Sequence, residues 1–504
     1  MTDLVSGPLA GLSCDLLVLP VDEGGVAAWA DAFGGAFETA LADARTAKGA
    51  AVLIPGGSGP RRVAVVDART PDGLERWRWA AAEGARAAAR VEAERVVVAT
   101  PPGAGADVSA ALVEGFRLGA YRFDHYRTAA APPAASLALW SEGVVDDLGG
   151  AVERADVRAD VTNRARDYVN LAPDEKMPAD LADLVAADAE AVGLRVEVWD
   201  KSRIEEEQMG GLLGVNRGSL DPPRFVVLEW APEGHADDDP VVLVGKTVTY
   251  DTGGLSLKPT KNSMDKMKAD MAGGAAVAGA LLGAARLKLP LRVIGLLPMS
   301  DNRPGGRAYV PGDVLTMHSG ATVEVMNTDA EGRLLLADAL SYARTYTPRW
   351  VLDAATLTGA QGVALGERVA AVVTRVGEEA LAERVRAAGD ATGDLAWPLP
   401  LYPHYRDQLK SDVADLSNVG GAMAGTITAA AFLEHFTHAD DEGGAANENG
   451  AGGADDAPAF PWVHLDLARP AFLDSAYGYR PKGGTGFGVR LLLDLLTNDA
   501  EPTA

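Results

Sequence analysis

Apolar segments and helix-forming segments alternate along the first part of the chain. The segments 14–21, 61–68 and 95–100 are short runs rich in Leu, Val and Ala, which is the pattern of buried strands. Between the last two, residues 76–94 (RWRWAAAEGARAAARVEAE) combine alanine with charged residues, a composition that favours a helix. Strands that alternate with helices predict a mainly parallel sheet covered by helices.

A boundary follows this first region. Residues 129–136 (AAAPPAAS) predict a loop or an irregular connection. A helix is predicted at about 148–170, and Pro173 and Pro178 mark its end because proline disfavours helix at and before its own position. The predicted organisation is an N-terminal α/β domain at 1–155, a linker helix at 156–177 and a C-terminal domain at 178–504.

The alternation resumes after this boundary with further apolar runs. Strands are predicted at 194–200, 223–230, 239–245, 291–299 and 349–357. Residues 272–287 are nearly all Ala, Gly, Leu and Val, which predicts a tightly packed buried helix. The predicted fold class is α/β in two domains, each a mainly parallel or mixed sheet flanked by helices.

One late segment breaks the pattern. Residues 438–460 are rich in Gly, Asp, Asn and Ala and contain almost no large apolar side chain. Such a composition buries too little surface to offset the entropy of ordering, so we predict a disordered acidic surface loop. It is either a tolerated insertion, the simpler interpretation, or an acidic gate that repels acidic peptides. Its flanks, 427–436 and 462–468, predict a buried helix and a buried strand.

Composition narrows the class of protein. With 504 residues and 47% hydrophobic residues, the chain is long enough for two or more globular domains. The single cysteine, Cys14, excludes an intramolecular disulfide framework, and no signal peptide or membrane span is visible, so we expect a cytoplasmic protein. The net charge of -25 disfavours broad binding to nucleic acid or anionic membranes. That acidity indicates either a solvated surface or, less simply, a saline habitat.

Candidate chemistry lies in three blocks: 244–258, 264–271 and 327–333. Asp and Glu are hard oxygen ligands that suit Mg, Mn and Zn ions. A set of acids able to share two divalent cations, with lysines beside it, suggests metal-assisted hydrolysis. The residues singled out are Lys246, Asp251, Lys258, Asp270, Asp329, Glu331 and Arg333.

Each of these residues has an ordinary explanation when taken alone. An aspartate after a strand, such as Asp251, is most often a turn or cap residue. Lys258 and its neighbouring lysines are also consistent with a solvated basic face. Lys246 is a poor metal ligand unless it is neutral, although a nearby dication strongly lowers the pKa of an amine. The joint occurrence of these residues in this order outweighs the ordinary explanations.

This joint pattern resembles the leucyl aminopeptidase (cytosol aminopeptidase) family of metallopeptidases. The segment NTDAEGR at 327–333 is the signature of that family, and the resemblance extends over most of 160–495. Other matching segments are GLLGVNRGS (211–219), RPGGRAYVPGDVL (303–315), DAATLTGA (353–360), WVHLDLA (462–468) and GGTGFGVRLLLDLL (483–496). The resemblance implies a catalytic C-terminal domain and an N-terminal domain with a regulatory or assembly role.

The resemblance also implies roles for individual residues. Asp251 and Glu331 would bridge two divalent metals, Lys246 and Asp270 would complete a tight site, and Asp329 would complete an exchangeable one. The metals would be Zn or Mn, with Mg or Co possible at the exchangeable site, and would activate a hydroxide. Lys258 would polarise the scissile carbonyl and stabilise the gem-diolate, and Arg333 would hold a bicarbonate ion as general base. Residues of the first-residue pocket would be Met267, Thr356, Gly359 and Ala468.

The expected activity is release of an N-terminal amino acid, preferably apolar such as leucine, from peptides by a cytoplasmic homohexamer. One rival is a metal-dependent hydrolase of another bond, which substrate profiling on amides, esters and phosphoesters would reveal. Another is a non-enzymatic binding protein with the same fold, which would require a broken ligand set. The ligand set is complete in this sequence.

Overall fold

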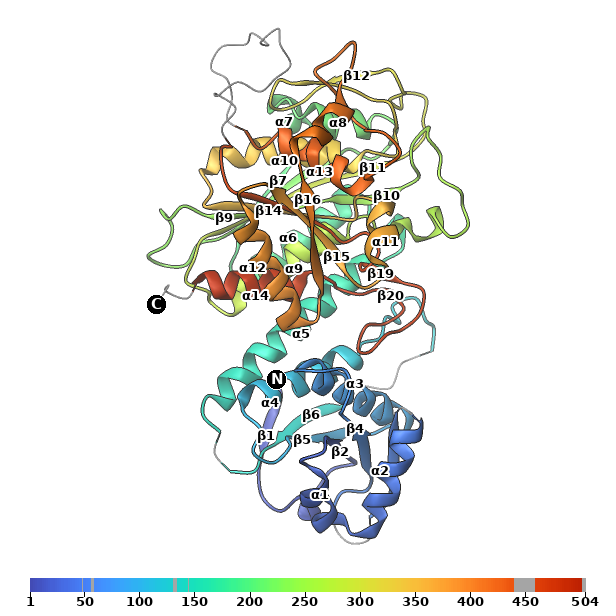
Figure 1. Cartoon of the computed structure of the whole chain (residues 1–504), viewed down its shortest axis with the longest axis vertical. Coiled ribbons are helices and arrows are strands. Elements are labelled where there is room, and N and C mark those ends of the chain that lie inside the picture. The colour runs from blue at the N-terminus through green and yellow to red at the C-terminus, as the bar shows by residue number, and fades with distance from the viewer. Residues whose placement is uncertain (48, 56–58, 130–133, 144, 439–457, 501–504) are drawn as a thin grey trace. The chain divides into compact units, whose positions relative to one another are not determined.

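The computed structural model describes residues 1–47, 49–55, 59–129, 134–143, 145–438 and 458–500. The chain divides into two compact units. Unit 1 is Met1–Asn163 with Asp474–Lys482, and unit 2 is Arg164–Leu473 with Gly483–Ala504. Each unit contains its own sheet flanked by helices (Figure 1), which confirms the predicted fold class.

Unit 1 is built on a six-stranded sheet in the order β1-β6-β5-β2-β4-β3. Its strands are β1 (Asp3–Val5), β2 (Leu16–Val21), β3 (Ala50–Leu53), β4 (Val63–Asp67), β5 (Arg95–Ala99) and β6 (Ser136–Trp140). All neighbours are parallel except β3, which pairs antiparallel with β4 at one edge. The three strands predicted in this region are therefore confirmed.

Helices cover both faces of the unit 1 sheet. They are α1 (Val26–Phe33), α2 (Gly35–Ala47), α3 (Glu75–Arg90), α4 (Ala106–Gly119) and the beginning of α5 (Leu148–Asn170), with one 3-10 turn, η1 (Leu9–Gly11). Because side chains alternate along a strand, Leu16 and Val18 pack against α3 and α4. Leu17 and Leu19 pack against α1 and α2 on the other face.

Unit 2 is built on a mixed nine-stranded sheet. Its order is β16-β15-β18-β14-β9-β11-β8-β7, and β10 pairs in addition with β11. The strands are β7 (Arg195–Trp199), β8 (Arg224–Trp230), β9 (Val241–Gly245), β10 (Thr247–Asp251), β11 (Val293–Asn302), β14 (Trp350–Ala355), β15 (Ala370–Arg375), β16 (Ala396–Leu401) and β18 (Trp462–Asp466). The central strands β9, β11, β14 and β18 are mutually parallel where they pair. All five strands predicted for this part of the chain are present.

Two layers of helices enclose this sheet (Figure 1). One layer contains α6 (Pro178–Ala191), α9 (Ala272–Arg286), α12 (Glu379–Thr392) and α14 (Val489–Ala500). The other contains α8 (Gly210–Asn216), α10 (Gly332–Ala343) and α13 (Gly425–His435). Unit 2 also contains the end of α5 and the short helices α7 (Lys201–Glu206) and α11 (Gly359–Leu365). Among the described residues, no helix is both long and apolar enough to cross a membrane.

Smaller elements complete unit 2. One three-stranded sheet contains β12 (Val314–Thr316), β13 (Thr322–Glu324) and β17 (Leu416–Ser417), and a two-stranded sheet contains β19 (Phe472–Leu473) and β20 (Gly483–Gly484). The 3-10 turns are η2 (Pro173–Glu175), η3 (Met264–Ala269), η4 (Arg344–Tyr346) and η5 (Pro403–Leu409).

The small residues of α9 allow it to lie very close to the sheet. A Cβ atom on Gly273 would be 2.1 Å from the carbonyl oxygen of Ala354, and one on Gly274 would be 2.1 Å from Thr247 Oγ1. Any larger residue at either position would push the helix away from β10 and β14. The predicted tightly packed helix is thus confirmed, and it packs directly against β10 and β14.

The predicted loop 438–460 is only partly covered by the structure. Its residues 439–457 lie outside the described residues, as do residues 130–133 of the predicted connection 129–136. The flanks of the loop are the predicted helix, α13, and the predicted strand, β18. His438 and Pro458 form an isolated antiparallel bridge that brings the two flanks together.

Candidate metal centre

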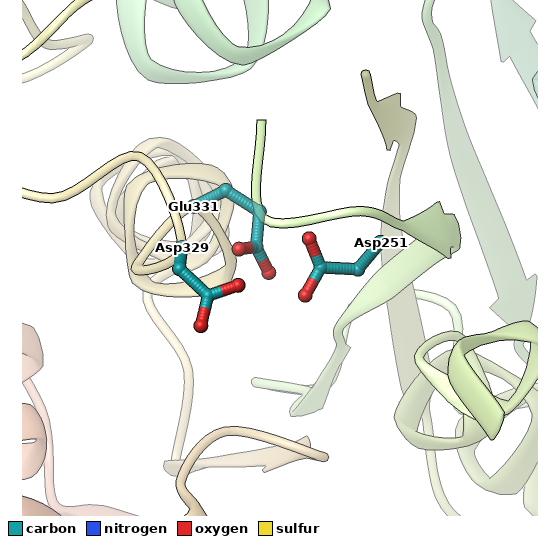
Figure 2. Close-up of side chains that lie close together, drawn as sticks. All are labelled: Asp251, Asp329 and Glu331. Atoms are coloured by element: carbon teal, nitrogen blue, oxygen red, sulfur yellow. The ribbon is translucent and has the colours of Figure 1, made fainter. Parts of the chain in front are cut away.

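Three carboxyl groups converge at one edge of the unit 2 sheet. Asp251 is the last residue of β10, while Asp329 and Glu331 lie in the turn that leads into α10. Each offers an oxygen within 4.8 Å of an oxygen of the other two. Figure 2 shows the three groups pointing toward a shared space. Because ligand oxygens lie about 2.0–2.6 Å from a divalent cation, this spacing fits one cation held by all three.

Lys246 joins a fourth acid to this group. Lys246 follows β9 directly, and its Nζ lies 2.8 Å from Asp270 Oδ2 and 2.9 Å from Glu331 Oε1. Asp270 caps the end of η3, immediately before α9. All three side chains are almost completely buried. Asp270 and Glu331, which are distant in the sequence, are thus held on either side of one ammonium group.

Lys258 contacts the two remaining acids. Its Nζ lies 2.8 Å from Asp251 Oδ2 and 2.5 Å from Asp329 Oδ1. Asp251 is buried, whereas 32% of the Asp329 side chain and 14% of the Lys258 side chain are exposed. The Lys258 ammonium group is therefore at the accessible side of the cluster. Together these contacts unite six of the seven residues that the sequence singled out.

Burial and repulsion raise the pKa of most acids in the cluster. Burial, followed by repulsion from Glu331, raises the pKa of Asp251 to about 7. Burial also raises the pKa values of Asp270 and Asp329. The pKa of Glu331 is lowered instead, because the charges of Lys246 and other neighbours outweigh the effect of burial. A cation bound here would stabilise the ionised form of every acid.

The two lysines are held in their charged form by these acids. Burial by itself would lower the pKa of Lys246, but attraction to Asp270, Glu331 and Asp251 raises it. The pKa of Lys258 is raised in the same way, by Asp251 before the other acids. An amine must be neutral to ligate a metal. Metal binding by Lys246 would consequently release its proton.

The donor set fits divalent cations. Four carboxyl groups share only two ammonium groups in this buried cluster, and repulsion among these acids adds to burial in raising the pKa values of Asp251, Asp270 and Asp329. Asp270 Oδ2 and Asp329 Oδ1 are buried and lie at ion-pair distance from a lysine, yet neither accepts a well-directed hydrogen bond within the described part of the chain. Buried anionic oxygens with unused lone pairs are unfavourable without a cation and are ligands that Mg, Mn and Zn accept.

Arg333 is the seventh residue and lies on the first turn of α10. Its side chain is buried, and its Nη1 donates to the carbonyl oxygen of Asn418 at 2.8 Å. Burial lowers the pKa of Arg333 to about 10, so the guanidinium remains charged at neutral pH. Its Nε has no hydrogen-bond partner in the described residues. A buried guanidinium with an unused N–H donor can bind a small anion.

Asn302 is a functional candidate that sequence reasoning missed. It is the last residue of β11, is completely buried, and donates from Nδ2 to Asp251 Oδ1 at 2.9 Å. The same Nδ2 lies 3.3 Å from Glu331 Oε2 and 2.9 Å from the carbonyl oxygen of Thr328. Asn302 therefore orients the two acids that were expected to bridge the metals. The available signal was the polar end (SDN) of an otherwise apolar strand.

A second missed residue, Asp466, organises the turn after β14. Asp466 Oδ1 accepts the backbone N–H groups of Leu357 at 3.2 Å and Ala468 at 3.2 Å, and Oδ2 accepts the hydroxyl of Thr358 at 2.6 Å. Thr356 precedes this turn, and its carbonyl oxygen accepts a hydrogen bond from Lys246 at 3.0 Å. The turn is thereby fixed against the metal centre.

The four residues expected to line a pocket are placed around this turn and η3. Thr356 Oγ1 donates to Asp270 Oδ1 at 2.8 Å, and the backbone carbonyl oxygen of Met267 accepts the N–H of Asp270 at 3.2 Å. Gly359 begins α11, and Ala468 is tied to Asp466. Two of the four thus contact a metal-centre residue directly. Their role in binding a substrate side chain stays a prediction.

Comparison with known proteins covers both units. Residues 163–493 match the catalytic-domain model of the cytosol aminopeptidase family, and residues 30–130 match the N-terminal-domain model of the same family. The chain belongs to the cytosol aminopeptidase family. It is a peptidase of the aminopeptidase type, and the resemblance found in the sequence is confirmed.

Individual relatives support this assignment. A probable cytosol aminopeptidase of Chlorobium luteolum is 40% identical over 97% of both chains. One of Chlorobaculum tepidum is 46% identical over 77% of this chain and 75% of its own length. Among solved structures, the bottromycin maturation enzyme BotP in complex with Mn has a TM-score of 0.81 and 35% identity, and covers 97% of this chain and 100% of its own. A tomato leucine aminopeptidase mutant has a TM-score of 0.84 and 26% identity, and covers 99% of this chain and 97% of its own.

Proposed function

We propose that this family member releases the N-terminal amino acid, preferably an apolar one such as leucine, from peptides, with two divalent metal ions per chain. The observation that carries the proposal is the convergence of Asp251, Asp329 and Glu331 beside the Lys246–Asp270 pair. The metals are Zn or Mn, with Mg or Co also suited to the more exchangeable site. The manganese complex of BotP supports this choice.

The contacts support a division of the ligands. Asp251 and Glu331 are the most central acids, since each contacts a different lysine and both accept from Asn302, so we assign them as bridging ligands. Lys246 and Asp270 are buried and complete the tighter site. Asp329 is partly exposed and completes the exchangeable site. When bound, the two metals would supply Lewis acidity and lower the pKa of water.

Lys258 is assigned to the scissile carbonyl group. It is the more accessible lysine of the pair, and the surrounding carboxylates keep it protonated. An ammonium group at this position donates a hydrogen bond to the oxygen on which negative charge develops. Loss of one such donor costs about 3–4 kcal/mol of transition-state stabilisation in other enzymes.

Arg333 is assigned to a bicarbonate ion that acts as general base. Its buried, charged side chain and its unused Nε support an anion site next to the metal ligands. The carboxylates of the cluster are all committed to lysines or metals, so an anion held by Arg333 supplies the group that accepts a proton. In this assignment Arg333 binds and orients the base and does not itself transfer a proton.

The remaining features of the proposal concern the substrate and the assembly. Met267, Thr356, Gly359 and Ala468 would line the pocket for the first side chain, and mostly offer small or apolar surface. We propose a cytoplasmic homohexamer, as the family relationship suggests, in which residues 1–155 serve regulation or assembly and 178–504 catalysis. The segment 156–177 would link the two.

A substrate panel tests the proposed activity. Leucine amide, N-acetyl-leucine amide, a leucine ester and a phosphoester are incubated with the manganese-loaded enzyme. In this proposal a bound metal would ligate the free amine of the substrate, so leucine amide should be cleaved and the acetylated amide should resist. Rapid cleavage of the acetylated amide, or of the phosphoester alone, would replace the proposal with an amidase or with a hydrolase of another bond.

A further inference from the structure

Lys176 is a buried lysine whose amine contacts backbone carbonyl groups. Its side chain is fully buried in unit 2, and no carboxylate among the described residues forms an ion pair with it. Its Nζ instead donates to three carbonyl oxygens, those of Tyr168 at 3.1 Å, Val169 at 2.8 Å and Lys268 at 2.6 Å. Burial, and then the charge of Lys268, lower the pKa of Lys176 well below its usual value. Burying this amine is costly, so the three contacts need an explanation.

Two of these carbonyl oxygens belong to the end of a helix. Tyr168 and Val169 lie in the last turn of α5, where carbonyl groups lack partners within the helix. A positive charge at a helix C-terminus is favourable because the helix dipole is negative there. An exposed lysine or water would satisfy these groups equally well. Capping of α5 therefore does not explain why the lysine is buried.

The third carbonyl oxygen connects the helix end to the metal centre. It belongs to Lys268 of η3, the 3-10 turn that carries Met267 and ends next to Asp270. The side chain of Lys268 forms the reverse contact, with its Nζ 3.0 Å from the carbonyl oxygen of Asn170 at the end of α5. Lys176, which follows η2, thus bridges α5 and η3, and the Lys268 side chain adds a direct contact between them. We call these two connections the clamp.

The clamp acts on a proposed metal ligand. The backbone N–H of Asp270 donates to the carbonyl oxygen of Met267, and the Asp270 carboxylate contacts Lys246 and Thr356. Asp270 is thus held from the side of β9 and β14 through its carboxylate, and from the side of α5 through the backbone of η3. On its other side η3 is attached to β10, where the Tyr250 hydroxyl donates to the carbonyl oxygen of Met264 at 3.0 Å and the N–H of Val248 donates to the carbonyl oxygen of Asp270 at 3.3 Å. Loss of the clamp would therefore free the side of η3 that faces α5.

We infer that Lys176 is a positioning residue that holds η3, and with it Asp270 and Met267, at the metal centre. The inference rests on the proposed function, since it gives Asp270 a metal to bind and Met267 a substrate to contact. Loss of the clamp should weaken metal binding at the Asp270 site and raise KM. Capping of α5 alone would produce neither effect.

The test compares Lys176→Met, which keeps the length but removes the donors, with Lys201→Met. Lys201 is exposed on α7, with Glu205 as its partner, and serves as the matched control. Two readouts do not require catalysis: the affinity of the metal-depleted full chain for Mn²⁺, and amide hydrogen exchange at residues 264–270. KM and kcat for leucine amide are measured in parallel.

For Lys176→Met we expect about 10-fold weaker Mn²⁺ binding, the lower end of the range seen when direct partners of metal ligands are removed, because Lys176 acts on Asp270 through η3. Exchange at 264–270 should become faster and KM should rise, while Lys201→Met stays like wild type. Lys176→Gln keeps two N–H donors and should give intermediate values. If Lys176→Met folds and has wild-type Mn²⁺ affinity and wild-type amide hydrogen exchange, the inference is overturned. If Lys176→Met does not fold, wild-type Mn²⁺ affinity and hydrogen exchange in Lys176→Gln would overturn it. Failure of wild type to cleave leucine amide while these readouts respond would instead refute the proposed function alone.

Discussion

The contacts of Asn302 give a quantitative prediction about metal binding. Its amide nitrogen carries two hydrogens, which are shared among Asp251, Glu331 and the carbonyl oxygen of Thr328. Asn302→Leu keeps the approximate size of the side chain and removes both donors. Asp251 and Glu331 then lose the amide donor that orients their carboxylates toward each other.

The expected magnitude follows from the kind of hydrogen bond removed. A hydrogen bond to a charged group contributes about 1.5–3 kcal/mol, compared with about 1 kcal/mol for a neutral one. Removal of partners that orient metal ligands weakens metal binding about 10- to 100-fold. We therefore expect Asn302→Leu to lower Mn²⁺ affinity by that factor and to reduce the stabilisation that Mn²⁺ gives the protein by about 1.4–2.7 kcal/mol.

Asn216 provides a matched control in the same unit. It is also a buried asparagine, and its Nδ2 donates to the carbonyl oxygen of Asp221 at 2.9 Å and to Ser300 Oγ at 3.2 Å. Both acceptors are neutral and neither is a proposed metal ligand. Asn216→Leu should therefore destabilise the metal-free protein by about 1–2 kcal/mol but leave Mn²⁺ affinity unchanged.

The assay is a Mn²⁺ titration of metal-depleted wild type and both variants, followed by calorimetry and by thermal unfolding. Weakened Mn²⁺ binding in Asn302→Leu, but not in Asn216→Leu, is the expected result. Equal Mn²⁺ affinity in Asn302→Leu and wild type would refute the reasoning. Asn302 would then contribute to stability only.

Three further predictions address other residues. Lys258→Met should lower kcat about 10²- to 10³-fold, as for other lost oxyanion donors, with normal metal content by elemental analysis. The control is Lys261→Met, at an exposed lysine. A small change in kcat for Lys258→Met would show that Lys258 takes no part in the mechanism. Arg333→Ala should lower turnover with near-normal metal content, and bicarbonate should stimulate depleted wild type but not the variant; loss of metal would make the role of Arg333 structural. Burial raises the pKa of Asp338 to about 7, so the folded chain keeps a proton that the unfolded chain loses near pH 4. Its contribution to stability should fade as pH rises from about 4 to about 7, and Asp338→Asn should remove this part of the pH dependence of unfolding; identical pH dependence in both proteins would contradict this.

The elements that the sequence predicted correctly are those with a strong local pattern of apolar or small residues. The central strands of unit 2 are buried on both faces, so they appear in the sequence as continuous apolar runs. The small residues at 272–287 likewise reflect a local requirement, because α9 lies too close to β10 and β14 to carry larger side chains. The metal-centre residues were found because they lie in compact blocks at strand and turn ends.

The positioning residues could not be found in this way. The strand predicted at 291–299 continues to Asn302, because Ser300, Asp301 and Asn302 are buried by tertiary contacts that local hydrophobicity does not reveal. Lys176 contacts a segment about ninety residues later in the chain, and Asp466 contacts one more than a hundred residues earlier. The return of Asp474–Lys482 to unit 1 also has no local signal. Such contacts depend on the folded arrangement and not on the neighbouring sequence.

The central claim is that two divalent cations at this cluster are required to release an N-terminal residue. The most direct measurement follows metal content and leucine amide hydrolysis in the same samples, as metal-depleted enzyme is titrated with Mn²⁺ or Zn²⁺. Metal-depleted enzyme should be inactive, activity should rise with occupancy up to two metals per chain, and Asp270→Ala should lose the tighter metal and nearly all turnover. Full activity in a sample free of metal, or wild-type turnover in Asp270→Ala, would contradict the claim.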